Sequence, residues 1–600
     1  MSATPLPVAS TQDGTYPRPQ LMRREWADLT GTWDFALGAP DAQPADVAFD
    51  RTITVPFPPE SAASGLAEGG MLHSVWYRRR ITAADLAAAG AAAGAGAAAD
   101  ERVLLHFGAV DWEATVWVNG VVVATHRGGQ SPFTADITAV LRADGGDEII
   151  VHAVDDPEDV SILRGKQDWR DQPHAIWYHR TTGIWQPVWL EAVPRTAISR
   201  LGWSSDIPTA GVSVDVELSG PIDEDAWLHV ELRHDGEILA EARTKVLSRC
   251  ETVRLTLPRQ TNGQQYEELL WSPESPQLID AVVRLASPVS SDAVASYLGM
   301  RSVGTDGTAF LLNDRPVTLR AVLAQNYWPE SHLAAPSAEA LRREVELIRE
   351  LGFNTARVHQ KAEDPRFLHW ADRLGLMVWA ETASAYAFDR RAVTNLVSEW
   401  TSLVVRDLSH PSVIVWVPLN ESWGVQHIAH DPRQRALSRS VADITRALDG
   451  TRPVISNDGW EHTRSDIWTI HDYEARPEVL AARYGDAASL DAMISGFGPA
   501  GRRISVDGDT GIKPIMLTEF GGVSLRPANG TDWGYSTADT PEEFGDRVCA
   551  LIAAAEAAAP LSGFCYTQLT DTGQETNGLL YDDRSPKVPI AAIRAAVLGQ

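Results

Sequence analysis

The sequence predicts three domains, two β-sandwiches followed by a parallel (β/α)₈ barrel. A chain of 600 residues is longer than a single hydrophobic core accommodates. Up to about residue 300, apolar and polar residues alternate in the period of a β-strand, with turn residues between the runs. After Arg301, short apolar runs alternate with amphipathic helical stretches, which is typical of a parallel sheet covered by helices.

The first sandwich is predicted for residues 1–195. Strand-like runs such as 103–107 and 115–118 follow one another without intervening helices. The dipeptide Asn119-Gly120 separates two such runs, and it is a strong signal for a type I′ hairpin turn. Residues 86–99 contain only alanine and glycine after Leu86. This stretch is shorter than the ~20 residues of a membrane helix, so we interpret it as a surface insertion between strands.

A second, smaller sandwich is predicted for residues 196–302. The runs 212–218 and 227–232 again alternate with a period of two. About a hundred residues of this pattern match the size of one immunoglobulin-like domain.

The barrel is predicted for residues 303–600. The candidate strands are 317–321, 355–359, 376–381, 413–419, 454–457, 467–471, 515–518 and 563–567. Helical patterns lie between most of them, for example at 337–351, 366–374 and 392–408. Eight strands over about 300 residues have the count and size of a (β/α)₈ barrel, whose active site lies at the carboxyl ends of its strands.

Two glutamates follow the fourth and seventh of these strands, Glu421 and Glu519. A carboxylate beside a buried strand costs desolvation energy unless it is paired or used. In a barrel the two would converge at one place, which is the geometry that cleavage of a glycosidic bond requires. The alternative is a pair of core glutamates that are satisfied by salt bridges.

Composition excludes several functions. The chain has 52 Lys and Arg against 80 Asp and Glu, a net charge of −28, which argues against a nucleic-acid partner and favours a soluble acidic surface. Three widely spaced cysteines, Cys250, Cys549 and Cys565, form no disulfide or metal-binding pattern, and we expect no metal and no cofactor. Residues 1–20 show no signal peptide, so a cytoplasmic protein without a membrane segment is expected, with secretion by a non-standard route left open.

The chain resembles the retaining glycoside hydrolases of family 2. Five motifs carry this resemblance in the family's order: residues 29–35, residues 182–191, residues 271–278 with 298–301, Asn420-Glu421, and residues 518–521. The resemblance implies a jelly-roll sugar-binding domain, an immunoglobulin-like domain and a catalytic barrel. It also implies that Glu519 is the nucleophile and Glu421 the general acid/base of a double displacement.

The same resemblance suggests partners for the two glutamates. Asn420 is placed to bind the sugar 2-hydroxyl, or else it caps the following turn. Arg357 resembles the arginine that keeps the nucleophile ionised. Tyr473 matches a tyrosine that hydrogen-bonds the nucleophile, although a loop tyrosine at an interface is the alternative.

Further residues are candidates for binding sugar. His359 and His471 stand at strand ends, where they contact sugar hydroxyls or pack in the core. His471-Asp472 lacks a third ligand for a metal site. The other two candidates are aromatic: Trp533 lines the mouth or simply packs, and Tyr566 sits where the family usually has a tryptophan as subsite floor.

The departures from the family concern the sugar. No His-Glu-His cluster of the galactosidase branch follows the first strand, and no Asn-x-Lys pair of the glucuronidase branch follows Glu519. Lys361 could bind an acidic sugar, but extension of its side chain to solvent is the favoured interpretation. The glycone therefore stays open among galactose, glucose, mannose, an amino sugar, a uronic acid and arabinofuranose.

The expected activity is that of a retaining exo-glycosidase with a carbohydrate substrate. A non-catalytic carbohydrate-binding protein on the same scaffold is one alternative, and a transglycosylase is another. The sequence does not indicate an oligomeric state.

Overall fold

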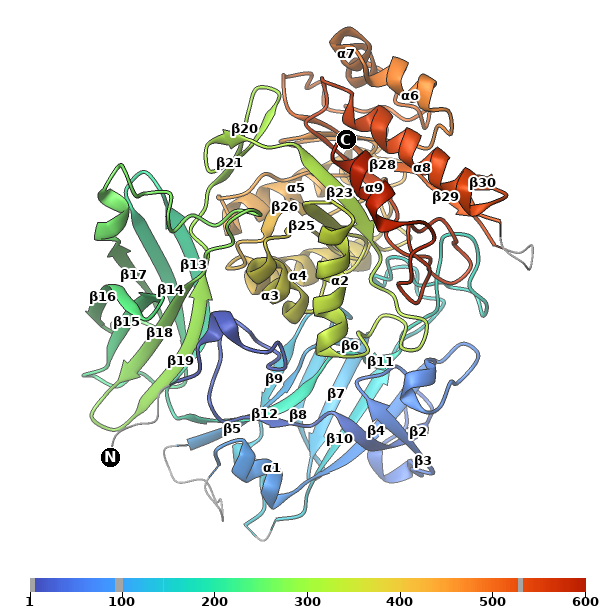
Figure 1. Cartoon of the computed structure of the whole chain (residues 1–600). Coiled ribbons are helices and arrows are strands. Elements are labelled where there is room, and N and C mark those ends of the chain that lie inside the picture. The colour runs from blue at the N-terminus through green and yellow to red at the C-terminus, as the bar shows by residue number, and fades with distance from the viewer. Residues whose placement is uncertain (1–5, 92–100, 144, 527–531) are drawn as a thin grey trace.

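The computed structural model describes residues 6–91, 101–143, 145–526 and 532–600 (Figure 1). Two all-β regions occupy the first half of the chain, and helices alternate with parallel strands in the second half. Within the described residues, no helix is both long enough and apolar enough to cross a membrane.

The first region consists of two main antiparallel sheets around one apolar core. The four-stranded sheet has the order β1 (Ala27–Asp28), β12 (Val188–Pro194), β5 (Glu101–Phe107), β9 (Phe133–Asp136). The six-stranded sheet has the order β3 (Arg51–Val55), β2 (Gly31–Leu37), β4 (Ser74–Ile81), β10 (Asp147–Val154), β7 (Glu113–Val118), β8 (Val121–Arg127). Inward side chains of both sheets, such as Phe35, Leu105 and Val151, share the core.

Two local predictions can be compared with this region. Asn119 and Gly120 join β7 to β8 with φ angles of 53° and 81°, so the type I′ hairpin is confirmed. The predicted insertion at 86–99 begins inside a short helix, α1 (Ala83–Ala88), and its residues 92–99 lie outside the described part of the chain. A short two-stranded pair, β6 (Val110–Asp111) and β11 (Gly183–Ile184), completes the region.

The second region also has two antiparallel sheets. One contains β13 (Ala197–Asp206), β14 (Gly211–Ser219) and β17 (Cys250–Thr256). The other contains β16 (Glu237–Lys245), β15 (Trp227–His234), β18 (Ile279–Ala286) and β19 (Ser291–Leu298). Alternate residues of β14 and β15 are buried between the sheets, as the period-two pattern predicts.

The second half of the chain contains a seven-stranded parallel sheet. Its order is β26 (Val413–Val417), β25 (Met377–Glu381), β24 (Thr355–Val358), β23 (Leu319–Ala324), β31 (Gly563–Thr567), β28 (Ile515–Gly521), β27 (Trp468–Asp472). The helices are α2 (Ala338–Glu350), α3 (Pro365–Leu374), α4 (Arg390–Asp407), α5 (Pro432–Leu448), α6 (Pro477–Tyr484), α7 (Ala487–Ser495), α8 (Pro541–Glu556) and α9 (Ile590–Val597). Short strands flank the sheet at β20 (Val303–Asp306), β21 (Ala309–Leu312), β22 (Arg315–Pro316), β29 (Val523–Leu525) and β30 (Ser536–Ala538).

Local sequence explains where these helices begin. Side chains at the N-cap positions of α2, α3, α4, α5 and α8 accept hydrogen bonds from the first helical turn, and they are Ser337, Asp364, Asp389, Asp431 and Thr540. In α3, α5 and α8 a proline occupies the first helical position, where no backbone donor is lost. The predicted helices at 337–351, 366–374 and 392–408 agree with α2, α3 and α4 within about two residues.

The predicted strand at 454–457 is not a regular strand. Val454 and Asp458 form only isolated bridges, with Trp416 and Asn420 respectively. Polar side-chain bonds interrupt the ladder, since the Ser456 amide donates to the Ser465 hydroxyl at 2.9 Å. The segment lies along β26 and is tied to β27 where the amide of Gly459 donates to Thr469 Oγ1 at 2.8 Å. It therefore connects the two edge strands of the sheet without being a strand.

The first strand of the sheet begins later than predicted. The amide of Val317 donates to Phe310 O at 3.0 Å, so this residue belongs with the preceding antiparallel strands. β23 therefore begins at Leu319. It ends at Ala324, three residues beyond the predicted end at Ala321.

Candidate active site

Glu421 and Glu519 lie at the same end of the parallel sheet. Glu519 is inside β28, which runs two residues beyond it, so it is not past the end of its strand as predicted. Glu421 follows β26 and has a left-handed backbone with φ of 49°. Its amide donates to Asp458 O at 3.0 Å, and this bond stabilises a backbone conformation that is rare outside glycine.

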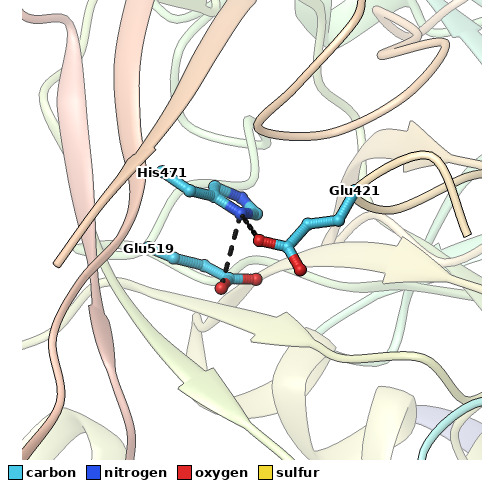
Figure 2. A group of neighbouring side chains, drawn as sticks. All are labelled: Glu421, His471 and Glu519. Carbon is cyan, nitrogen blue, oxygen red and sulfur yellow. Dashed lines mark hydrogen bonds and ion pairs between the residues drawn. The ribbon is translucent and has the colours of Figure 1, made fainter. Parts of the chain in front are cut away.

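His471 connects the two glutamates (Figure 2). Its Nδ1 lies 2.7 Å from Glu421 Oε1 and 3.4 Å from Glu519 Oε2. One oxygen of each carboxylate and this nitrogen lie within 4.8 Å of one another. The two carboxylates and the imidazole therefore face one small space.

The surroundings of Glu519 keep it ionised. Arg357 Nη1 donates to Oε1 at 2.8 Å, and the Tyr473 hydroxyl donates to Oε2 at 2.6 Å. Burial by itself would raise the pKa of Glu519, but the positive charges of His471 and Arg357 outweigh it and hold the pKa well below its usual value.

Glu421 is shifted in the opposite direction. Burial, followed by the negative charge of Glu519, raises the pKa of Glu421 above its ordinary value. His471 and Lys166 act against this rise without cancelling it. The site thus contains one carboxylate that prefers to be ionised beside one that holds a proton more readily, which is how acid and nucleophile roles are separated.

A buried ion cluster lies behind the two glutamates, with Arg357 at its centre. Its guanidinium donates to Glu381 Oε1 at 2.5 Å and to Asn420 Oδ1 at 2.6 Å, and it forms an ion pair with Asp458 at 2.9 Å. Arg357 has no exposed surface, so these acceptors offset the cost of burying its charge.

His471 is held as a cation by the same cluster. Its Nε2 lies 3.1 Å from Asp458 Oδ2, on the side opposite Glu421. Burial would lower the pKa of His471, but Glu519, Asp458 and Glu421 together raise it to about 10. The sequence indicated no role for Asp458. This contact gives it one, because its carboxylate helps to keep His471 protonated.

Glu421, His471 and Glu519 are also the residues that could hold a metal ion, judged from the described part of the chain. A metal ligand must be unprotonated, whereas both nitrogens of His471 face carboxylate oxygens and its pKa is about 10. A protonated His471 between carboxylates therefore explains this arrangement better than a bound metal ion does.

The structure brings most of the other sequence candidates to this place. Asn420 accepts from Arg357, so its Nδ2 is left as the donor, and this atom has no protein partner within the described residues. His359 lies beside Arg357, with Nδ1 3.3 Å from Arg357 Nη2 and 3.3 Å from a Glu381 oxygen. Burial and the adjacent Arg357 hold the pKa of His359 well below its usual value, so its imidazole is neutral.

Two aromatic candidates are placed differently. Trp533 contacts Tyr535 edge-on at 4.6 Å, and Tyr535 stacks on Tyr473, so Trp533 reaches the site through another ring. Contrary to the expectation of a subsite floor, Tyr566 has no exposed surface and packs edge-on against Phe520 in the apolar core. The structure does not bring Tyr566 into contact with the space above the glutamates.

Lys361 does not extend to solvent, so that interpretation is wrong. Only 2% of its surface is exposed. Its Nζ donates to Asn326 O at 3.1 Å and to Leu333 O at 3.3 Å, and it pairs with Glu363 at 3.5 Å. Asn326, which supplies one of these carbonyls, has a left-handed backbone with φ of 50°. Through its two hydrogen bonds Lys361 holds two loops together.

Sequence reasoning missed the residues that the first region contributes. The amides of Arg164 and Gly165 donate to Ser384 O at 3.1 and 3.0 Å, which seats a loop of the first region on the end of the parallel sheet. Lys166 follows directly, 5% exposed, with its Nζ 5.8 Å from the ring centre of Trp423. The one hint in the sequence is its 21 tryptophans, since an indole ring can stack on a ligand as well as pack in a core.

The chain is similar in sequence to known glycosidases. Residues 303–531 match the model of the glycosyl hydrolases family 2 TIM barrel domain. The chain is 26% identical over 391 residues to a β-galactosidase of Thermoanaerobacter pseudethanolicus, covering 62% of the chain and 49% of the relative, so it spans about half of that relative's length. It is 24% identical over 563 residues to a β-glucuronidase of Canis lupus familiaris, covering 85% of the chain and 79% of the relative.

The fold resembles that of a solved structure, the β-glucuronidase of Bifidobacterium dentium complexed with coumarin-3-O-glucuronide. The TM-score is 0.76 at 18% sequence identity, and the match covers 96% of this chain and 98% of the other. At this identity the likeness concerns the fold alone.

Proposed function

Since the chain belongs to glycoside hydrolase family 2, we propose that it is a retaining exo-glycosidase. The observation that carries the proposal is a pair of carboxylates that have one oxygen of each within 4.8 Å of the other and pKa values moved in opposite directions. Retaining glycosidases require carboxyl groups about 5–5.5 Å apart, whereas inverting enzymes need about 6.5–9.5 Å to admit a water molecule.

In the first step Glu519 attacks the anomeric carbon while Glu421 gives its proton to the departing oxygen. The glycosidic bond breaks, and an ester forms between the sugar and Glu519. In the second step Glu421, now a carboxylate, takes a proton from water, and that water cleaves the ester.

The ester itself prepares Glu421 for the second step. The negative charge of Glu519 is one of the two largest causes that raise the pKa of Glu421. Formation of the ester removes this charge, so the pKa of Glu421 falls and the residue serves as a base. His471 remains beside both residues throughout as a fixed positive charge.

The remaining site residues take binding roles in this proposal. Asn420 Nδ2 donates to the 2-hydroxyl of the sugar, and Arg357 and Tyr473 hold the nucleophile in place. His359 offers Nε2 to another hydroxyl. The loop of the first region that is seated on Ser384 closes one side of the site, which favours an enzyme that acts on chain ends.

The proposal includes the domain organisation. Residues 1–195 form a jelly-roll domain, residues 196–302 an immunoglobulin-like domain and residues 303–600 the catalytic barrel. The paired antiparallel sheets with a shared core in each of the first two regions support this assignment.

The stereochemistry of hydrolysis tests the mechanism. A panel of nitrophenyl pyranosides and furanosides first identifies the glycone, and proton NMR then records the anomer that is released first. Retention is expected, and inversion would refute the assignment of Glu519. A 2-deoxy-2-fluoro glycoside of the same sugar should label Glu519, as peptide mass spectrometry can establish, and Glu519→Gln is the control that should not be labelled.

The same experiments separate the alternatives. Sugar binding without turnover of any member of the panel would favour the non-catalytic protein. A product that carries the sugar on an added alcohol, in preference to free sugar, would favour the transglycosylase.

A further inference from the structure

A cavity of about 380 Å³ opens beside Glu421, and aromatic rings form most of its wall. Trp177 stacks on Trp423 at 5.9 Å with 28° between the ring planes. Trp169 meets Tyr386 edge-on at 5.2 Å, and Tyr386 meets Trp423 at 6.0 Å. The four rings are thus a continuous wall, and each keeps part of its surface exposed.

This wall is held in place by contacts between two regions of the chain. Trp169 and Trp177 come from the first region, and Tyr386 follows β25. The Tyr386 hydroxyl donates to Gly165 O at 3.0 Å, which ties the two regions together at the wall. His174 stacks on Trp177 at 4.9 Å. A ligand therefore meets rings that are already positioned, and little entropy is lost in ordering them.

The position of the cavity decides which part of a substrate it receives. Glu421 is one of its lining residues, and Glu519 is not. In a double displacement the sugar lies over the nucleophile, while the acid/base contacts the oxygen of the leaving group. The cavity beside Glu421 therefore lies on the side of the leaving group. This step depends on the proposed function.

Two of the polar side chains that line the cavity, Gln426 and Arg502, are already engaged, and the indole nitrogens of Trp177 and Trp460 are buried without a hydrogen-bond partner among the described residues. Gln426 donates to Tyr386 O at 2.6 Å. Arg502 is paired with Glu461 at 2.8 Å and lies over the ring of Trp460 at 4.9 Å. A second sugar here would leave several hydroxyls without partners, and each unpaired group would cost free energy.

We propose that this cavity is an aglycone site for a flat apolar alcohol, and that the enzyme acts on glycosides of aromatic alcohols in preference to disaccharides. Aromatic rings stack favourably on tryptophan faces and need no hydrogen bonds from the wall. The volume lies within the range of small-molecule sites.

Paired substrates with the same glycone test this proposal. Benzyl and 2-methoxyethyl alcohols have similar acidity, so a difference between their glycosides reports binding of the aglycone and not leaving-group ability. The benzyl glycoside should have a kcat/KM about tenfold higher or more, because its ring is buried against the wall. Equal values, or a higher value for a disaccharide with the same glycone, would overturn the proposal.

Variants locate the effect on the wall. Trp177→Ala should remove most of the benzyl preference, with a much smaller loss on the 2-methoxyethyl glycoside, and Trp177→Phe should retain part of the preference. Trp227→Ala is the matched control, because this tryptophan lies in the second region at the start of β15, where Arg243 covers its ring. Equal losses on both substrates in Trp177→Ala would contradict an aglycone role.

Direct binding separates this proposal from the proposed function. Isothermal titration of the intact wild-type protein with 2-naphthalenemethanol should show binding that Trp177→Ala abolishes. If no glycoside is hydrolysed but this binding is found, the glycosidase assignment fails and the apolar site stands. If glycosides are hydrolysed without an aromatic preference and without this binding, the glycosidase assignment stands and the apolar aglycone site fails.

Discussion

Gly459 packs against His471 so closely that a single methyl group should disable the site. A Cβ at position 459 would lie 2.3 Å from three atoms of the imidazole ring. Carbon contacts normally begin near about 3.5 Å, so the ring would have to move by about 1 Å. Misplacement of a catalytic group by about 1 Å costs on the order of 100-fold in rate, so Gly459→Ala should lower kcat/KM by about that factor.

A second glycine provides a matched control for this substitution. Gly459 has a φ of 79°, which any side chain adopts with strain of about 1–2 kcal/mol. Gly508 has a φ of 74°, and a Cβ added there would meet no atom within 4 Å, so Gly508→Ala carries the strain without the clash. Both variants should lose the thermal stability that the strain costs, Gly459→Ala should lose more because of its clash, and only Gly459→Ala should lose activity.

The assay is kcat/KM on the best nitrophenyl glycoside, with thermal unfolding measured on the same preparations. The reasoning would be refuted if Gly459→Ala folds normally and keeps kcat/KM within about threefold of wild type, because His471 would then tolerate displacement. It would also be refuted if Gly508→Ala lost as much activity, because strain alone would then explain the effect.

Three further predictions concern the groups around the glutamates. Tyr473→Phe removes a hydrogen bond to a charged carboxylate, an interaction of about 1.5–3 kcal/mol, and should lower kcat/KM by at least about tenfold; unchanged kinetics would exclude Tyr473 as a partner of Glu519. Lys166→Met removes a positive charge that lowers the pKa of Glu421. Because Glu421 must be protonated to act as acid, the basic limb of the pH profile of kcat/KM should move to higher pH, and a shift to lower pH would contradict this. Treatment with EDTA followed by gel filtration should leave kcat/KM unchanged, since the raised pKa of His471 keeps it protonated, and activity restored only by an added divalent cation would show otherwise.

The sequence was informative wherever a few neighbouring residues determine the structure. Asn119-Gly120 specifies its own turn, and the N-cap residues specify where helices begin. The segment 454–457 looked like a strand because it follows the same short apolar pattern. Its backbone is instead satisfied by side chains such as that of Ser465, which is nine residues away from Ser456, and no periodicity reports such bonds.

In the site, too, the sequence indicated only those residues that are marked by their neighbours along the chain. Glu421 and Glu519 could be found because each stands beside a buried strand that marks it locally. Lys166 and Trp177 could not, since they belong to a loop of an all-β region that lies far in the sequence from the parallel sheet it contacts. Their position depends on how two regions of the chain pack against each other, which is a property of the tertiary structure.

The charges of the site explain why its residues depend on one another. Glu381, Asp458 and Glu519 surround Arg357 in a space from which water is largely excluded, and His471 supplies a second cation. Without His471, these three carboxylates would share the single positive charge of Arg357, and burial would favour protonation of at least one of them. A protonated Glu519 could not attack a sugar. The buried cluster is therefore not only structural, because it keeps the proposed nucleophile Glu519 ionised, while the pKa of Glu421, which has one oxygen within 4.8 Å of a Glu519 oxygen, stays above its ordinary value.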